Sequence, residues 1–420
     1  MSYTYTDKIK FAQTPNFDAF QRLRVSDPMT LFDSSHRYAD NGLWVSSTAG
    51  TATVVFNQNQ GLINLNVGSA SGDTIIRETT KVFSYQPGKS LLVMNTFVME
   101  PAKTGLRQRV GYYGASNGIY FQLEGSTAAF VERSLVTGSI TESRISQFGG
   151  VYGGGDTGWN YDQMDGTGPS GIVLDLTQAQ ILWMDVEWLG VGTVRTGFVI
   201  NGELILCHKF DHANIIQSTY ITTASLPLRY EITNTGATSS NSTLKQICST
   251  VISEGGYELR GVQSAIGTPI ASPHALATAG TYYPLVSIRL KSSPNRLDAI
   301  VIPSSISVMG ASTGDFNWRV TVGGTTAGGA WVSGGADSSV EYNISGTSIS
   351  GSARRVLASG YFARTTQSSS VVEIGKDNLF KFQLERNGLT NTPYEMTLEV
   401  AAGTNTETAF GSMDWEEISR

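Results

Sequence analysis

Residues 181–207 read ILWMDVEWLGVGTVRTGFVINGELILC, and this stretch predicts three consecutive β-strands. Apolar, β-branched and aromatic residues fill 181–189, a Gly-Val-Gly run interrupts them, and 194–200 is a second extended run. Asn201 and Gly202 tolerate the positive φ angles of a two-residue hairpin turn, so 203–207 is expected to return as a third strand. A meander this apolar must be covered by a second sheet, which predicts a β-sandwich.

The composition of the whole chain also favours an all-β fold. Only 15 % of the 420 residues are charged and 46 are glycine, a balance typical of β-sandwiches rather than of helical or α/β enzymes. The net charge of −6 supplies no basic field for phosphates, so no nucleic-acid partner is expected. No apolar run approaches the ~20 residues that span a bilayer, so no membrane insertion is expected either.

Strand-like runs separated by turn signals predict two β domains. The larger is a jelly roll or β-sandwich at 31–257, and the smaller is a second β-sandwich at 281–403. Between them, 258–280 is rich in proline and small residues and is predicted to be a linker. The acidic end of the chain, 404–420, is predicted to be a C-terminal tail that is frayed or packed on a partner.

The first 30 residues are too short for a core of their own, yet they carry apolar and aromatic side chains between charges. Such an arm either straps its own domain or docks onto a neighbouring subunit. We favour docking, in which the apolar side chains are buried on the neighbour and the arginines pair with carboxylates or carbonyls there. The predicted docking residues are Phe17, Phe20, Arg22, Leu23, Arg24 and Val25.

Asp185 and Glu187 are the candidates for acid chemistry, because alternate residues of a strand share a face about 7 Å apart. Paired carboxylates at a related distance hydrolyse glycosides. The stretch is similar to the Glu-x-Asp-x-Glu strand of retaining β-glucanases with a concanavalin-like sandwich, but Trp183 stands where the first Glu, the nucleophile, is required. We therefore predict no catalytic residues and no enzyme, and keep a jelly-roll glycoside hydrolase as an alternative.

Glycan binding without hydrolysis is a second alternative, because a tryptophan and a carboxylate on one concave face can stack on a sugar and hydrogen-bond to it. The candidate glycan contacts are Trp159, Trp183, Asp185, Glu187 and Trp188.

Two groups of residues could hold a metal ion. Cys207, His208, Asp211 and His212 lie close together like half of a zinc site, but a second pair of ligands is absent, and a capped strand end is favoured. The long Gly-rich segment 149–171 carries Asp156, Asp162 and Asp165, where calcium is the alternative to a solvated loop. We predict no metal and no cofactor. Cys207 and Cys248 are expected to be two buried free thiols in strands, although a disulfide between them stays open.

Three stretches resemble tailed-phage virion structural proteins, those of cyanophages and other marine phages most nearly. They are FDAFQRLRVSDPMTLFDSSHRYADNGLW at 17–44, RETTKVFSYQPGKS at 77–90, and 159–231 with its WNYDQMDGTGPSG and LPLRYEI. The resemblance covers about 17–260. The meander around Asn201 and Gly202 also resembles concanavalin- and laminin-G-like jelly rolls, which is a likeness of fold alone.

The resemblance implies a structural component of a bacteriophage virion, made in the host cytoplasm. It would serve in the tail, the baseplate or the neck, or as a decoration of the capsid surface, with other virion proteins as partners. A homo-oligomer is expected, a trimer by preference, because appendages match symmetric platforms. A host-surface glycan is a further possible partner.

Overall fold

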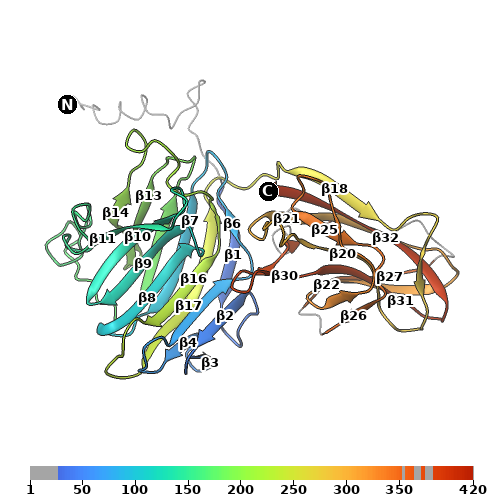
Figure 1. Cartoon of the computed structure of the whole chain (residues 1–420), viewed down its shortest axis with the longest axis horizontal. Helices are drawn as coiled ribbons and strands as arrows, with labels where there is room; N and C mark the ends of the chain where they lie inside the picture. Colours follow the sequence, from blue (N-terminus) through green and yellow to red (C-terminus); the bar gives the residue numbers. More distant parts are fainter. Residues whose placement is uncertain (1–26, 352–354, 364–369, 374–381, 420) are drawn as a thin grey trace, which may run out of the picture.

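The computed structural model describes residues 27–351, 355–363, 370–373 and 382–419, which form two β-sandwiches side by side (Figure 1). The predicted all-β fold with a jelly-roll first domain is confirmed, and no α-helix occurs in the described ranges. Accordingly, these ranges hold no helix of the length and hydropathy needed to cross a membrane. The docking residues Phe17, Phe20, Arg22, Leu23, Arg24 and Val25 lie outside the described residues.

The first sandwich packs two large antiparallel sheets face to face. One has the order β14 (Glu203–Phe210), β13 (Val194–Ile200), β12 (Gln180–Val186), β7 (Leu91–Val98), β17 (Ser242–Ser253), β4 (Leu62–Val67), β3 (Thr53–Asn57), with β1 (Met29–Ser35) paired to β17. The other has the order β11 (Thr141–Ser146), β10 (Thr127–Ser134), β9 (Gly118–Gly125), β8 (Lys103–Tyr113), β16 (Leu228–Asn234), β5 (Thr74–Thr79), β2 (Trp44–Ala49). A short ladder joins β6 (Phe83–Ser84) to β15 (Ser225–Leu226).

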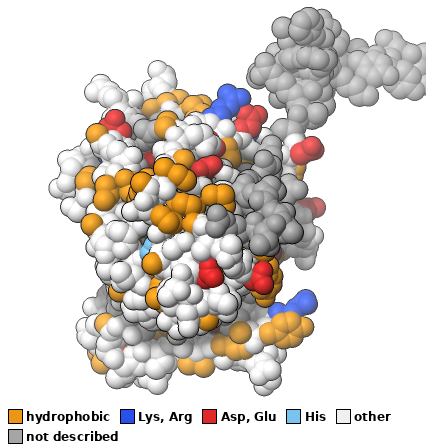
Figure 2. Space-filling view, turned by 90° about the vertical axis from the view of Figure 1, so that its right-hand side faces the viewer, with side chains coloured by type: hydrophobic (Ala, Val, Ile, Leu, Met, Phe, Trp, Pro, Cys, Tyr) orange, Lys and Arg blue, Asp and Glu red, His pale blue; other side chains and the backbone are white. Residues whose placement is uncertain are grey.

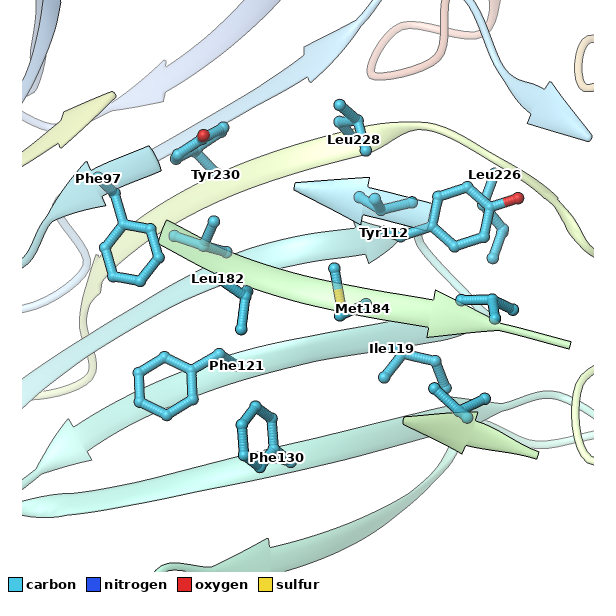
Figure 3. Packing of buried hydrophobic residues seen from close by; sticks show 14 of the residues in the cluster. Phe97, Tyr112, Ile119, Phe121, Phe130, Leu182, Met184, Leu226, Leu228 and Tyr230 are labelled. Atoms are coloured by element: carbon cyan, nitrogen blue, oxygen red, sulfur yellow. The ribbon is translucent and has the colours of Figure 1, made fainter. Parts of the chain in front are cut away.

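The predicted three-strand meander is present as β12, β13 and β14. Asn201 and Gly202 have φ angles of 53° and 86°, which is the two-residue hairpin that their sequence predicts. Along β12, Leu182, Met184 and Val186 point into the core, as expected for every second residue of a strand. Phenylalanines of both sheets meet in this core; Figure 3 shows Phe97, Phe121 and Phe130 among the labelled residues.

The second sandwich is smaller. Its first sheet has the order β18 (Val262–Gly267), β32 (Glu407–Ser419), β21 (Ile300–Gly310), β28 (Ser370–Glu373), with β19 (His274–Leu276) on β32. Its second has the order β24 (Val332–Ser333), β25 (Val340–Asn343), β20 (Tyr283–Leu290), β31 (Met396–Ala402), β22 (Asp315–Val322), β27 (Arg355–Ala363). Two short ladders complete it: β23 (Thr325–Ala327) with β26 (Ser348–Ser350), and β29 (Arg386–Asn387) with β30 (Thr392–Pro393).

Both segments predicted to lie outside the second sandwich belong to it. The predicted linker 258–280 contains β18 and β19, and both pair with β32. The predicted tail 404–420 contains β32, the longest strand among the described residues, and Trp415 on it is buried. Up to Ser419, this end of the chain is therefore not frayed but held by strand pairing within its own domain.

The two sandwiches meet in a buried junction. Val82 of the first packs with Ile300 and Ile302 of the second, beside the half-buried Leu259 and Ile418. The Gln383 amide donates to the carbonyl of Val82 (2.9 Å) and the backbone N–H of Arg386 to that of Thr80 (2.9 Å).

The junction also contains charge. The Glu78 carboxylate of β5 accepts from Arg229 of β16 and from Arg386 of the second sandwich. All three side chains are buried, and Arg386 also contacts Asp298 at 3.0 Å. Buried charges are tolerated only when they are paired. The pairing of Glu78 with Arg386 therefore favours the arrangement in which the two domains keep this contact.

Candidate functional site

The five predicted glycan contacts do not form one surface. Trp159 lies in the hydrophobic core, 4.8 Å from the ring of Phe130, and Trp183 is 5 % exposed with its indole N–H on the carbonyl of Ile205. Trp188 is half-buried and donates to the carbonyl of Ile221. These rings are therefore occupied by packing, and a stacking platform at Trp159 and Trp183 is not present.

The two carboxylates of the same group lie in different surroundings. Asp185 is buried on β12 and is held by Arg195 of β13, with Nε 2.8 Å from the carboxylate. Glu187 follows the end of β12 and is exposed.

The three aspartates of the Gly-rich segment accept hydrogen bonds from neighbouring residues of the chain. The Asp156 carboxylate accepts from Ser146, Val151 and Tyr152, and Asp162 accepts from the backbone N–H groups of Met164 and Ser170. Asp165 caps Thr167 in the same way. Within the described ranges, no three or more His, Cys, Asp or Glu side chains gather as metal ligands would.

The side chains of the zinc-like group contact different partners. His212 stacks on Tyr220 and its Nε2 lies 2.7 Å from Glu132, while His208 lies against Phe210. Both cysteines are free thiols. Cys207 is buried as predicted, but Cys248 is exposed, because it lies on the outer face of β17.

Two buried histidines give the first sandwich a pH dependence. Burial lowers the pKa of His36 to about 4, helped by Arg77, and burial lowers that of His208 to about 4. An unfolded histidine takes up its proton near pH 6.5, so both groups contribute stability that is complete above pH 6.5 and is lost as the pH falls towards 4.

We expect each histidine to contribute on the order of 2 kcal/mol to the loss of unfolding free energy between pH 7 and 4.5. Urea unfolding of the wild type and of His36→Phe at both pH values measures this loss. The variant should lose less unfolding free energy than the wild type. His212 acts in the opposite direction: burial lowers its pKa, but the hydrogen bond and charge of Glu132, the contact with the carbonyl of Gly192 and the charge of Asp211 together outweigh burial and raise it. Its contribution is present below pH 6.5 and is lost as the pH rises through the folded pKa. An equal loss of unfolding free energy between pH 7 and 4.5 in the wild type and in His36→Phe would contradict the prediction for His36.

The outer face of the sheet β11–β10–β9–β8–β16–β5–β2 carries an array of hydrogen-bonded polar side chains. On β9, Ile119, Phe121 and Leu123 belong to the core, so the alternate residues Tyr120, Gln122 and Glu124 face outward. The same alternation places arginines and glutamates of the neighbouring strands on this face. They are Arg107, Arg109, Arg133, Arg144, Arg229, Glu78, Glu142 and Glu231.

Glu142 on the edge strand β11 is the centre of this polar array. One of its oxygens accepts from the Tyr120 hydroxyl (2.7 Å) and from Arg133 (2.6 Å), and the other accepts from Arg144 (2.5 Å). Burial alone would raise the pKa of Glu142, but the hydrogen bonds from Tyr120, Arg144 and Arg133 lower it to about 2. The group is therefore a carboxylate at any physiological pH.

A groove of about 560 Å³ opens at this edge of the sheet. Its lining combines an exposed apolar side chain, an aromatic ring, a guanidinium and carboxylates; the lining residues are Ile140, Glu142, Ser143, Arg144, Tyr152, Gly155 and Asp156. The Arg144 guanidinium lies over the Tyr152 ring, 5.3 Å from its centroid. Asp156 fixes the loop that carries Tyr152, since its carboxylate accepts from the backbone N–H groups of Ser146, Val151 and Tyr152.

A second hollow, of about 610 Å³, lies in the second sandwich. It is lined by uncharged residues, among them Pro269, Pro273, His274, Tyr283 and Ile344. Hydrophobic side chains also gather on the end of this domain that Figure 2 faces. Of these two hollows, the groove on the first sandwich combines an aromatic ring with charged side chains. A third hollow, of about 470 Å³, also does so; its lining includes Tyr85, Tyr257, Lys89, Glu258 and Arg260.

Comparisons with known proteins give remote structural matches. No family model and no curated protein matches the sequence. A protein of unknown function from Shewanella oneidensis MR-1 is 11 % identical, covering 62 % of this chain and 98 % of its own, with a TM-score of 0.34. A legume lectin-like domain from Entamoeba histolytica is 11 % identical (53 % and 97 % covered, TM-score 0.31). A glycoside hydrolase family protein from Mycobacterium thermorestibile is 9 % identical (53 % and 99 %, TM-score 0.35). The resemblance to virion proteins stays a prediction.

Proposed function

We propose that this chain is a structural component of a tailed-phage particle and that it binds a glycan of the host surface in the groove beside β11. The particle assignment is supported by the resemblance over about 17–260. It also fits the buried junction, which fastens two sandwiches into one body. Domains of one chain move relative to each other unless their interface holds them, and a fixed body can transmit contact from a particle to a surface. Electron microscopy of an assembled particle tests the assignment, and the absence of the chain from purified particles would overturn it.

The groove is the observation that carries the binding role. Carbohydrates are bound by an aromatic ring together with a few fixed polar groups, and Tyr152, Arg144 and Glu142 supply these at one place. Arg144 and Glu142 are held by mutual hydrogen bonds, so little side-chain entropy is lost when a ligand arrives. In this proposal the chain binds the glycan and does not hydrolyse it.

Replacing Tyr152 by alanine should lower the affinity for the bound glycan about tenfold or more, because an aromatic contact in the groove is removed. A glycan array with the full chain identifies the ligand, and titration of wild type and variant gives the ratio. Tyr38→Ala is the matched control, since Tyr38 is 81 % exposed and lies outside the groove. Equal loss in both variants, or binding to no glycan, would contradict the proposal. Sugar release abolished by Glu187→Gln would instead identify a hydrolase.

A further inference from the structure

We infer that the groove recognises a neutral sugar through two adjacent hydroxyl groups, with Arg144 as the donor and Glu124 as the acceptor. This inference rests on the proposed glycan binding and names the class of ligand. It follows from which polar atoms around the groove are already engaged within the protein and which are not.

One edge of the Arg144 guanidinium is hydrogen-bonded within the protein, and the Nη1 atom can still donate a hydrogen bond to a ligand. Its Nε and Nη2 both donate to the same Glu142 oxygen, at 2.9 and 2.5 Å. Its Nη1 makes no hydrogen bond within the described residues; it forms a long ion pair with Glu124 Oε2, 3.8 Å away, which is beyond hydrogen-bond reach. The side chain is 30 % exposed, so Nη1 can donate to a ligand while Glu142 and Tyr152 hold the guanidinium in place.

Glu124 is complementary to this donor. Its Oε2 accepts from the Gln122 amide at 3.0 Å, whereas Oε1 accepts no hydrogen bond in the described part of the chain. The side chain is 32 % exposed, so a ligand hydroxyl can donate to it. A guanidinium donor and a carboxylate acceptor side by side therefore match a pair of neighbouring hydroxyls, each of which can both accept and donate.

The same surroundings disfavour an acidic sugar. A carboxylate placed at Arg144 Nη1 would lie close to Glu124 and to Glu142, which the three hydrogen-bond partners described above keep ionised. Asp156 is a second carboxylate of the lining, with Glu142. Like charges at this range repel, so a neutral hydroxylated ligand fits the groove better than an anionic one.

The test is a titration of the full chain with two series of oligosaccharides, neutral ones and their uronic-acid counterparts. Wild type should bind the neutral series more tightly. Arg144→Ala and Glu124→Gln should each weaken that binding about 10- to 100-fold, because each removes a hydrogen bond to a charged group. Arg37→Ala, a change of an arginine outside the groove, is the control and should leave affinity unchanged.

Deoxy analogues separate this inference from the function on which it rests. Removing one of the two recognised hydroxyls should lower the affinity of the wild type about as much as the variant of the residue that contacts this hydroxyl does. That variant should bind the deoxy analogue and the full sugar equally well. Tighter binding of uronic acids, or neutral binding untouched by both variants, would overturn the hydroxyl-pair inference and leave glycan binding standing. Binding of neither series would overturn both.

Discussion

Replacing Arg386 by alanine is expected to lower the free energy of unfolding by about 3–5 kcal/mol, because it leaves a buried carboxylate only half paired. Glu78 is 1 % exposed and its charge is shared between Arg229 and Arg386. Arg386 Nη1 also donates to the carbonyl of Thr79 at 3.0 Å, so the variant leaves a backbone acceptor unsatisfied as well. The lost contacts cross from one sandwich to the other.

Urea unfolding followed by fluorescence and circular dichroism measures this effect. Wild type should unfold with both domains coupled, and Arg386→Ala should show the first and second sandwich unfolding separately. Arg260→Ala is the matched control, since the Arg260–Glu258 pair is largely exposed and should contribute less than about 1 kcal/mol. A single, unshifted transition in Arg386→Ala would show that the ionic contact does not couple the domains.

Local patterns in the sequence predict the first sandwich well. Asn201 and Gly202 determine the hairpin, and alternation within 181–189 determines which side chains of β12 enter the core. These features depend on neighbours within a few residues, which is why no knowledge of the distant chain is needed.

The end of the chain was predicted wrongly because its partners are distant in sequence. The run Asp414-Trp-Glu-Glu417 suggests an exposed acidic tail, yet Glu416 and Glu417 are buried. Glu416 accepts from Gly261 and Gln263, and Glu417 accepts from the hydroxyl of Ser338 and the N–H of Ser339. These donors lie 78 to 155 residues away, so no local pattern indicates them.

The groove was missed for a related reason. In the run TESRIS of β11, alternating charges are typical of a solvated strand, and only the fold brings Tyr152 and Glu124 beside them. Conversely, Trp159 lies in a Gly-rich segment that predicts exposure, but its indole N–H reaches the carbonyl of Ile145 and its ring fills the core. An alternating Glu and Arg on an edge strand, followed by a Gly-rich loop with an aromatic residue, is the signal that could have indicated the site.

Phe121→Ala is expected to destabilise the first sandwich by about 3–5 kcal/mol, the usual cost of removing a buried phenylalanine and leaving a cavity. Phe121 is fully buried on β9, and its ring lies 5.4 Å from Phe130 in its own sheet and 5.3 Å from Phe198 in the opposite sheet. Phe97 of β7 and Trp159 also lie within 6.4 Å of it, so one side chain joins both sheets and the loop beside the groove.

The loop contact extends the effect to the site. When Trp159 loses Phe121, the 147–159 segment loses part of its anchor, and the groove should bind its glycan more weakly even where the variant is still folded. Urea unfolding gives the stability, and glycan titration at low temperature gives the affinity. Phe148→Ala changes a residue of the same segment that is 65 % exposed, so it should alter stability by no more than about 0.5 kcal/mol. A loss below about 1 kcal/mol in Phe121→Ala would mean that the two sheets do not depend on this aromatic cluster, contrary to the packing described above.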